Sequence, residues 1–462
     1  MRRLESLAPL SVLLSSLWLS TGVAAQPTLD PGHSYQLAEL IDIAQSSQPD
    51  TRIAWANARS AALAVGVAES ITLPRLAATV VAGQTRSQGQ SGTLGVNVGG
   101  DSSTSGSVLA LSLQWLLFDF GERDARVDAA RQTASASDQM FTAAHQRVVH
   151  AVCLAYYAYA AAHGHVATAE QSLKNAAAVE AAAVDRHAHG IGTVIEVAQA
   201  RQATAQVRLT LVQARGAQQD AYQSLISAMG VSPLSQLRIA ELPQRPLPQS
   251  LGGAIADIVA EALARRPDIL AAQAEQQAGA AGIRAAEADF LPKVFLGAMG
   301  GYVSGNLGLS TTPPLGPPLP TVNFAGSHWG SSVMVGVNLP LYDGHTRDAA
   351  LQQARLNADK AAAAYEQARN QAVRQVVAAK NALETSLAAN EAAAALQLAA
   401  QTTYDAAVDA YRLGVGSVTD ATLAQTQLLA ARQAASDAYS QTLAAAATLA
   451  FATGSLGASP AN

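Results

Sequence analysis

The sequence predicts an α+β membrane protein built from two repeats, each with two β-strands and a pair of long antiparallel helices. Three observations support this fold class: an internal duplication, two long stretches without proline, and short segments in which apolar and polar residues alternate. The duplication bears most directly on the fold, since an internal repeat decides how many structural units a chain contains.

Landmarks of the first half of the chain recur in the second half at two nearly equal offsets. Pro49-Asp50 recurs as Pro267-Asp268, an offset of 218 in residue number, and Gly190 recurs as Gly414, an offset of 224. The larger offset begins between Pro74 and Phe118, so a net insertion of six residues lies in that stretch. The predicted domains are a signal peptide (1–25), a first structural repeat (26–250) and a second structural repeat (251–462).

The start of the chain, 1–25, has the features of a signal peptide. Arg2 and Arg3 precede an apolar stretch over 7–19, and Val23-Ala24-Ala25 places small residues at the predicted cleavage site. No later apolar run approaches the roughly 20 residues that a membrane-spanning helix needs. Insertion of the mature chain into a membrane would therefore depend on β-strands, whose backbone groups bond to each other.

Composition and motifs exclude several classes of function. The formal net charge is −5 and there is no basic tract, which makes nucleic acid an unsuitable partner. The sequence contains no Gly-x-Ser-x-Gly, no His-Glu-x-x-His and no phosphate-binding loop. We therefore expect no enzyme, no cofactor and no metal site, and we assign the single cysteine, Cys153, to helix packing.

Two stretches without proline predict two unusually long helices. The stretch 122–189 contains one glycine and the stretch 345–413 contains none, so nothing forces either helix to break. At 1.5 Å per residue, each helix would be roughly 100 Å long. Paired glycines then predict a chain reversal, followed by return helices over 193–229 and 417–453. The expected helical hairpins span 120–229 and 344–453.

Each return helix is too short to cover its long partner, and a second helix in each repeat is expected to fill the gap. The segments 50–72 and 268–290 follow a proline and stop before the next one. We expect these helices to lie end to end with the return helices along the long ones. Short helices over 37–46 and 251–265 are expected beside each joint.

The segment before each long helix changes to the alternating pattern of a β-strand. Large apolar residues occupy every second position from Leu109 to Trp115 and, at the larger repeat offset, from Val333 to Leu339. With weaker strands before them, these segments predict β-hairpins over 76–117 and 294–341. The Gly- and Ser-rich stretches 84–107 and 304–331 are expected to be loops, where an insertion costs little.

Four strands per chain cannot close a barrel, and an open sheet edge is not tolerated in lipid. Bacterial outer-membrane barrels begin at about eight strands. At least two chains, and up to three or four, would therefore have to share one barrel if the strands enter a membrane. The large apolar residues would face lipid, and the small or polar residues would face a watery interior.

These landmarks give the chain a resemblance to the TolC-type outer-membrane efflux proteins, also called outer membrane factors. The resemblance is carried by Leu73-Pro74-Arg75 with Leu291-Pro292-Lys293, by Phe118-Asp119 with Tyr342-Asp343, and by the turn from Tyr411 to Asp420. It implies a homotrimer in which each chain gives four strands to a shared 12-stranded β-barrel in the outer membrane. Long antiparallel helices would continue that barrel as a periplasmic α-barrel.

The same resemblance implies a function and a set of partners. The function is the outer-membrane channel of a tripartite export system, with a periplasmic adaptor (membrane fusion) protein and an inner-membrane pump of the RND or ABC type. Substrates would pass passively, in multidrug efflux or in type I protein secretion. The alternative is a secreted coiled-coil stalk or adhesin without a pore, which would need neither the alternating segments nor the paired glycine turns.

The resemblance also implies a periplasmic gate where the long helices turn. Its residues would be Asp420, its repeat equivalent Glu196, and Tyr411. A ring of such carboxylates would select cations, whereas the alternative for either acid is to stabilise the first turn of a helix. Two residues depart from the family pattern, because Leu423 replaces an aspartate and Gly416 replaces an arginine. The tip residues expected to contact the adaptor are His189, Gly190, Ile191, Leu413, Gly414 and Val415.

Overall fold

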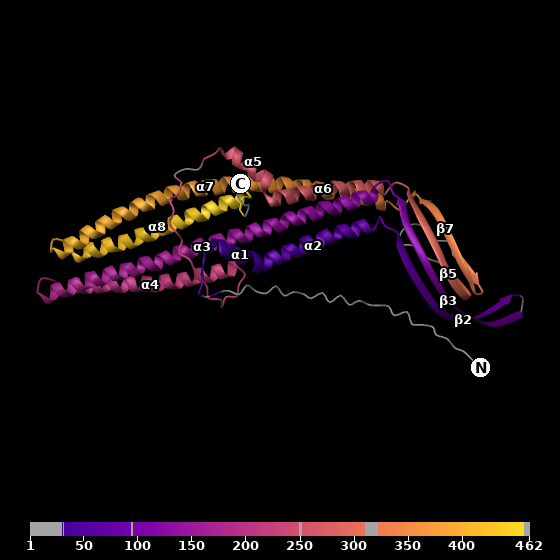
Figure 1. The fold of residues 1–462 in the computed structure, drawn as a ribbon, viewed down its shortest axis with the longest axis horizontal. Helices are drawn as coiled ribbons and strands as arrows, with labels where there is room; N and C mark the ends of the chain where they lie inside the picture. The colour runs from indigo at the N-terminus through magenta and orange to yellow at the C-terminus, as the bar shows by residue number, and fades with distance from the viewer. Residues whose placement is uncertain (1–29, 31, 94–95, 249–251, 310–321, 457–462) are drawn as a thin grey trace.

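The computed structural model has a β-sheet at one end of a long helical body and two helical turns at the other end (Figure 1). It describes residues 30, 32–93, 96–248, 252–309 and 322–456. The predicted signal peptide, 1–25, lies outside the described residues. None of the helices in the described ranges is long and apolar enough to cross a membrane.

Two helices of 67 residues each run along the body, α3 (Glu122–Ala188) and α7 (Thr346–Arg412). They continue unbroken because neither contains proline, as the sequence predicted. Each then reverses into a 35-residue helix, α4 (Val194–Ala228) after α3 and α8 (Val418–Ala452) after α7. The two predicted helical hairpins are therefore confirmed, and they pack side by side through α3 and α8 (Figure 1).

Two 22-residue helices complete the cover of the long helices. α2 (Pro49–Ser70) packs on α3, and α6 (Pro267–Ala288) packs on both α7 and α3. Each begins with a proline in its first turn, where the missing N–H has no partner to lose. The chain therefore has one covering helix of this kind in each half.

The return helices meet these two helices end to end, as predicted. Gln48, which precedes α2, donates from Nε2 to the carbonyl of Ala228 at 3.0 Å. In the second half, Arg266 donates from Nη1 to the carbonyl of Ala452, also at 3.0 Å. Both bonds satisfy a carbonyl at the end of a helix, which has no partner within the helix itself.

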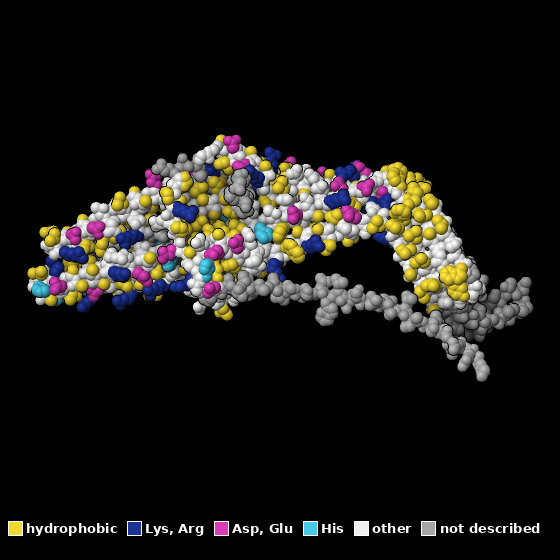
Figure 2. Space-filling model, viewed as in Figure 1, with side chains coloured by type: hydrophobic (Ala, Val, Ile, Leu, Met, Phe, Trp, Pro, Cys, Tyr) yellow, Lys and Arg dark blue, Asp and Glu magenta, His cyan; other side chains and the backbone are white. Residues whose placement is uncertain are grey.

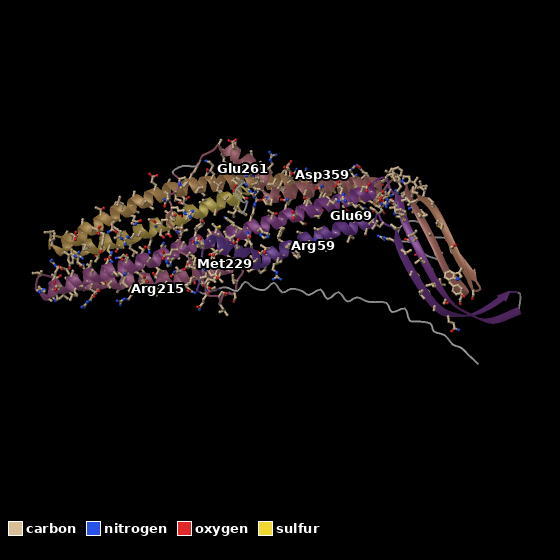
Figure 3. The ribbon with its side chains drawn as sticks, in the orientation of Figure 1. Arg59, Glu69, Arg215, Met229, Glu261 and Asp359 are labelled. Atoms are coloured by element: carbon tan, nitrogen blue, oxygen red, sulfur yellow. The ribbon has the colours of Figure 1, made fainter. Side chains whose placement is uncertain are left out.

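Two 11-residue helices flank the joints, α1 (Leu37–Ser47) against α3 and α5 (Ile255–Arg265) against α7. A two-stranded parallel sheet of β1 (Ser34–Tyr35) and β4 (Arg238–Ile239), which no sequence pattern indicated, lies near α1. Figure 3 places Met229 at the centre of this region, near the end of α4. The buried core there consists of Tyr35, Leu40, Ala44, Val148, Val152, Tyr156, Leu225, Ile226, Met229 and Leu237.

The sheet at the other end has the strand order β2-β3-β5-β7, with each strand antiparallel to its neighbours. Its two hairpins have the same register, because Arg75 lies opposite Gln114 and Lys293 lies opposite Asn338. The second pair corresponds to the first at the two repeat offsets found in the sequence. In the described part of the sheet, β2 and β7 each have one neighbouring strand and form open edges. The strands are β2 (Arg75–Thr93), β3 (Val96–Phe118), β5 (Lys293–Leu309) and β7 (His328–Asn338).

The predicted loops between the strands are wrong in extent. Much of 84–107 and part of 304–331 form strand, since β2 pairs with β3 along its whole length and β5 continues to Leu309. The predicted loop residues 94–95 and 310–321 lie outside the described residues. The short strand β6 (Val322–Ala325) pairs with the end of β5 in the same register as β7, so β6 and β7 form one side of a single hairpin in the second half. Gly- and Ser-rich segments have low intrinsic strand propensity, but the backbone bonds of a paired strand do not depend on side chains.

The alternation of side chains on the strands is as predicted. On β3, Leu109 and Leu111 are exposed, whereas Ala110 between them is buried. On β7, Val333, Val335 and Val337 are all exposed. Figure 2 shows hydrophobic side chains gathered over the sheet, while charged side chains are spread over the helices. The sheet therefore presents an apolar face.

Candidate functional site at the helical tips

The chain reverses at two tips with matching backbones, the first after α3 and the second after α7. Gly190 and Gly414 have positive φ angles of 77° and 82°, which glycine adopts without strain. Thr193 and Ser417 then cap the return helices, because each side chain accepts a hydrogen bond from the backbone three residues later. The sequence therefore specifies the same turn twice.

The second glycine of each turn packs closely against the end of the preceding helix. A Cβ atom at Gly192 would lie 3.0 Å from the backbone nitrogen of His187, and one at Gly416 would lie 3.0 Å from the Cβ of Ala410. Any side chain at these positions would crowd the end of the preceding helix. The glycine that replaces the family's arginine at position 416 therefore fits the tight turn.

Three residues from three helices meet at the tips: Arg186 of α3, Glu196 of α4 and Tyr411 of α7. Tyr411 is 1% exposed, and the guanidinium carbon of Arg186 lies 5.3 Å from the centre of its ring, within the range of a cation–π contact. Arg186 Nη1 also donates to the carbonyl of Tyr411 at 3.4 Å. This cluster, named here the tip cluster, connects the two helical hairpins.

The electrostatics of the tip cluster favour a neutral tyrosine. Burial raises the pKa of Tyr411, and the nearby carboxylate of Glu196 raises it further, while Arg186 acts in the opposite direction. Tyr411 Oη, Glu196 Oε2 and Arg186 Nε are buried without a hydrogen-bond partner among the described residues.

Asp420 lies apart from the tip cluster, in the exposed first turn of α8. Ser417 Oγ donates to Asp420 Oδ2 at 2.7 Å, and the backbone N–H of Asp420 donates to Ser417 Oγ at 3.1 Å. These bonds and the nearby helix N-terminus are those of a capping acid. Of the three predicted gate residues, Tyr411 and Glu196 therefore lie together, and Asp420 does not join them.

The tips themselves present apolar side chains to solvent. Ile191 in the first tip and Leu413 and Val415 in the second are exposed. Leu423, which replaces an aspartate of the family pattern, is exposed on α8 as well. The six residues predicted to contact an adaptor, namely His189, Gly190, Ile191, Leu413, Gly414 and Val415, are all exposed in this chain.

Arg186 is the member of the tip cluster that the sequence did not indicate. Its repeat equivalent is Ala410, but the last turn of α7 also carries an arginine, Arg412, so no pattern in the sequence distinguished Arg186. Its contact with Tyr411 joins positions 225 residues apart. A contact over that separation depends on how the two hairpins pack.

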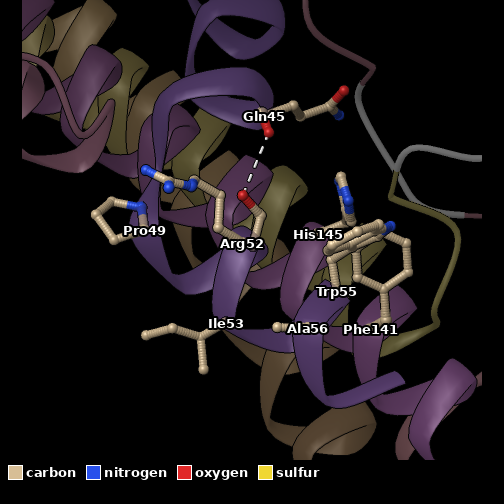
Figure 4. Close-up of a pocket in the computed structure, with 9 residues that line it drawn as sticks. Gln45, Pro49, Arg52, Ile53, Trp55, Ala56, Phe141 and His145 are labelled. Atoms are coloured by element: carbon tan, nitrogen blue, oxygen red, sulfur yellow. Dashed lines mark hydrogen bonds between the residues drawn. The ribbon is translucent and has the colours of Figure 1, made fainter. Parts of the chain in front are cut away.

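A depression of about 570 Å³ lies far from the tips, at the start of α2 (Figure 4). The described residues that line this depression include Trp55, Phe141 and His145, and none of them is acidic. In the described ranges, no group of three or more His, Cys, Asp or Glu residues is placed to hold a metal ion. The tips are therefore the stronger candidate for a functional site.

Comparison with known proteins identifies the relatives of this chain. A family model described as outer membrane efflux protein matches residues 40–231 and 258–455. Protein CyaE of Bordetella pertussis is 30% identical over 407 residues, covering 88% of this chain and 81% of that protein. The toluene efflux pump outer membrane protein TtgC of Pseudomonas putida is 26% identical over 411 residues, covering 87% of this chain and 79% of TtgC.

A solved structure shares the fold over nearly the whole chain. The outer-membrane channel OprN superposes with a TM-score of 0.75 at 20% identity, covering 93% of this chain and 94% of OprN. The two segments matched by the family model lie one in each half of the sequence and together include both long helices. The chain therefore belongs to the outer membrane efflux protein family.

Proposed function

We propose that three copies of this outer-membrane protein form the duct of a tripartite export system. Substrates would be delivered by an inner-membrane pump and a periplasmic adaptor and would pass through the duct passively. The observation that carries the proposal is the joining, in one chain, of an apolar open-edged sheet to helices of 67 residues. At 1.5 Å per residue these helices extend about 100 Å, far beyond the thickness of a bilayer.

The open edges of the sheet support the assembly of several copies. β2 and β7 have unpaired backbone groups along one side in the described chain, and lipid cannot satisfy them. Three chains that each contribute β2, β3, β5 and β7 would close a barrel of 12 strands with no edge left. A shared barrel therefore explains why one chain has so small a sheet.

The tip cluster supports a closed periplasmic end. Arg186, Glu196 and Tyr411 hold the two hairpins together at the point where a tube of helices would narrow. Opening the tip would separate α3 from α7 and would expose Tyr411 to water. In the assembled trimer, three copies of Asp420 would add a ring of negative charge that favours cations.

The exposed tips support docking of an adaptor. Ile191, Leu413 and Val415 would remain in water on a free duct, and apolar surface of this kind marks contact sites. Neither tip carries a cluster of charge of one sign, so the contact would depend on shape and apolar packing. The proposed partner surface of the adaptor is accordingly apolar.

The inner-membrane pump would determine which substrate is exported, since a passive duct does not select strongly among substrates. TtgC is named for a toluene efflux pump, and another relative, the Escherichia coli protein CusC, for a cation efflux system. The proposal covers small-molecule efflux and type I protein secretion by the same duct. The alternative of a stalk without a pore is unsupported, because the relatives and the fold neighbour are efflux proteins and channels.

Planar bilayer recordings test the proposal. We expect outer-membrane fractions to contain a heat-modifiable trimer that conducts in planar bilayers with a preference for cations. Circular dichroism of the same sample would contain a β contribution from the sheet. A monomer that leaves the bilayer sealed would contradict the proposal.

A further inference from the structure

One depression on the chain has no role in the tips or in the sheet. It has a volume of about 570 Å³ and lies at the corner between α1 and α2, against α3 (Figure 4). We infer that this depression is a sugar-binding site for the glycan of the cell wall, a polymer of amino sugars that carry carboxylates. The site would act independently of the proposed duct, since it does not touch the exported substrate.

Part of the lining of this depression is aromatic. Phe141 and His145, one turn apart on α3, meet edge to face with ring centres 4.6 Å apart. Trp55 of α2 lines the same depression with a side chain that is 59% exposed, and Figure 4 shows the three rings gathered together. One face of a pyranose ring consists of C–H groups and stacks on flat aromatic carbon. An exposed aromatic group of this kind therefore fits a sugar ring.

The rest of the lining supplies polar groups and a positive charge. Arg52 is exposed and lies one turn before Trp55 on α2, and Gln45 lies at the end of α1. The amide of Gln45 and the ring of His145 can form hydrogen bonds with sugar hydroxyls. A guanidinium group binds a carboxylate through two parallel hydrogen bonds. Because the described lining contains no acidic residue, the site favours a sugar that carries a carboxylate over a neutral one.

Hydrogen bonds hold the corner between α1 and α2, so the site exists without a ligand. The hydroxyl of Thr51, which is buried, lies 2.7 Å from the carbonyl oxygen of Gln48 and 3.3 Å from that of Gln45. The second of these bonds is the dashed line in Figure 4. Pro49 fixes the first turn of α2. The volume of the depression also lies within the range of roughly 300–1,000 Å³ that is usual for ligand sites.

The second half of the chain shows that the fold does not require these side chains. α6 begins with a proline, as α2 does, and both helices have 22 residues. At the smaller repeat offset, Arg52 and Trp55 correspond to Leu270 and Gln273. The same backbone therefore forms in the second half without a tryptophan. An exposed tryptophan at only one of two equivalent joints points to a ligand rather than to a requirement of the helix.

The position of the site along the body favours the cell wall over membrane lipid. Trp55 precedes the end of α2 at Ser70 by 15 residues, and the sheet begins only at Arg75. At 1.5 Å per residue, Trp55 is separated from the end of α2 by about 22 Å. The headgroups extend only about 5–8 Å beyond each side of the hydrocarbon core. The headgroups of a bilayer around the sheet therefore do not reach the site, whereas the glycan of the cell wall lies in the periplasm.

Co-sedimentation of the full-length protein in detergent with isolated cell-wall sacculi tests the site. We expect the unaltered protein to pellet with the sacculi, and Trp55→Ala to weaken this binding about tenfold because the stacking face is lost. Trp55→Phe keeps a flat ring and should retain most of the binding. Arg52→Gln should weaken binding to sacculi roughly fivefold. The same variant should bind chitin oligosaccharides, which are amino sugars without carboxylates, as the unaltered protein does.

Two matched controls leave the lining of the depression intact. Arg59→Gln removes an exposed arginine two turns beyond Arg52 on the same helix, and Gln273→Ala truncates the repeat equivalent of Trp55. Both control variants should bind sacculi as the unaltered protein does. None of the substituted residues lies at the tips or in the sheet, so every variant should keep its conductance in planar bilayers.

The outcomes separate the sugar site from the duct. Binding that is weakened in Trp55→Ala and kept in both controls supports the site. Equal binding by Trp55→Ala and Arg59→Gln overturns the site, as does an unaltered protein that stays in the supernatant. Binding that survives digestion of the glycan by a muramidase assigns the contact to protein left on the sacculi, and competition by purified lipopolysaccharide assigns it to a lipid-linked sugar; either result overturns the site. Binding through Trp55 by a protein that does not conduct would overturn the duct and leave the sugar site.

Discussion

The first and second halves of the chain share a backbone and differ in the side chains at its two ends. At the tips, Arg186 of the first half stands where the second half has Ala410. Beside the sheet, the buried Glu122 stands where the second half has Thr346. Turn glycines, first-turn prolines and caps are kept in both halves because the backbone needs them. Arg186 and Glu122, two of the residues that differ, connect one half of the chain to the other.

The largest expected effect concerns the connection beside the sheet. Lys293 Nζ lies 2.7 Å from Glu122 and 2.6 Å from Asp289, and Glu122 is buried. Lys293→Met would leave that buried carboxylate with Arg126 as its remaining ionic partner. Breaking a buried ion pair typically costs about 3–5 kcal/mol, and we expect a loss near the lower limit, measured as a fall in the thermal midpoint of the detergent-solubilised protein.

The repeat equivalent supplies the control for this substitution. Arg75 corresponds to Lys293, and the positions that correspond to Glu122 and Asp289 are Thr346 and Ile71, which carry no charge. Arg75→Met should therefore shift stability by no more than about 0.5 kcal/mol, as for an ordinary surface change. Equal losses in both variants would mean that the two halves do not differ here.

The second expected effect concerns the tip cluster. Arg186→Ala removes the cation over the Tyr411 ring and the bond to the Tyr411 carbonyl. A loss of about 1–2 kcal/mol from the closed tip would raise the ratio of open to closed ducts roughly 5- to 30-fold. Single-channel recordings measure this as a greater open probability. Arg412→Ala, which removes an exposed arginine beside the other tip, should change it little, and an equal response would argue against the cluster.

Features that depend on local sequence could be predicted, whereas features that depend on contacts between distant segments could not. The long helices and turns were predictable, since the absence of proline and the placement of Gly190 and Gly414 are local properties. Within the described residues, the loops 84–107 and 304–331 were predicted too long, because Gly- and Ser-rich segments become strand only through pairing with a neighbour. The family resemblance assigned Tyr411, Glu196 and Asp420 to one gate, without indicating that Asp420 would lie apart from the other two. Arg186 was missed because its role depends on the packing of distant helices.

A smaller effect is expected from the ionisation of Tyr411. Burial and the carboxylate of Glu196 raise the pKa of Tyr411 above the ordinary value of about 10. The closed tip is therefore more stable when Tyr411 is a neutral phenol than when it is a phenolate. The neutral phenol stabilises the closed tip fully below about pH 10, and this stabilisation is lost as the pH rises through the higher pKa that Tyr411 has in the closed tip. Open probability should therefore increase in alkaline solution, and Tyr411→Phe should abolish the increase. An unchanged alkaline response in that variant would assign the titration to another group.

The smallest expected effect is that of Asp420, which lies outside the tip cluster. Asp420→Ala removes the bond that Ser417 Oγ donates to the carboxylate and the negative charge near the N-terminus of α8, while the backbone N–H still bonds to Ser417, so the substitution should cost only about 0.3–1 kcal/mol. If a ring of Asp420 carboxylates also lines the duct, Asp420→Ala lowers cation selectivity, measured as a shift of reversal potential in a salt gradient. Asp420→Asn separates the two roles, because the amide oxygen still accepts from Ser417 but carries no charge. Selectivity retained in Asp420→Asn would limit Asp420 to helix capping and would leave Glu196 as the remaining predicted gate acid.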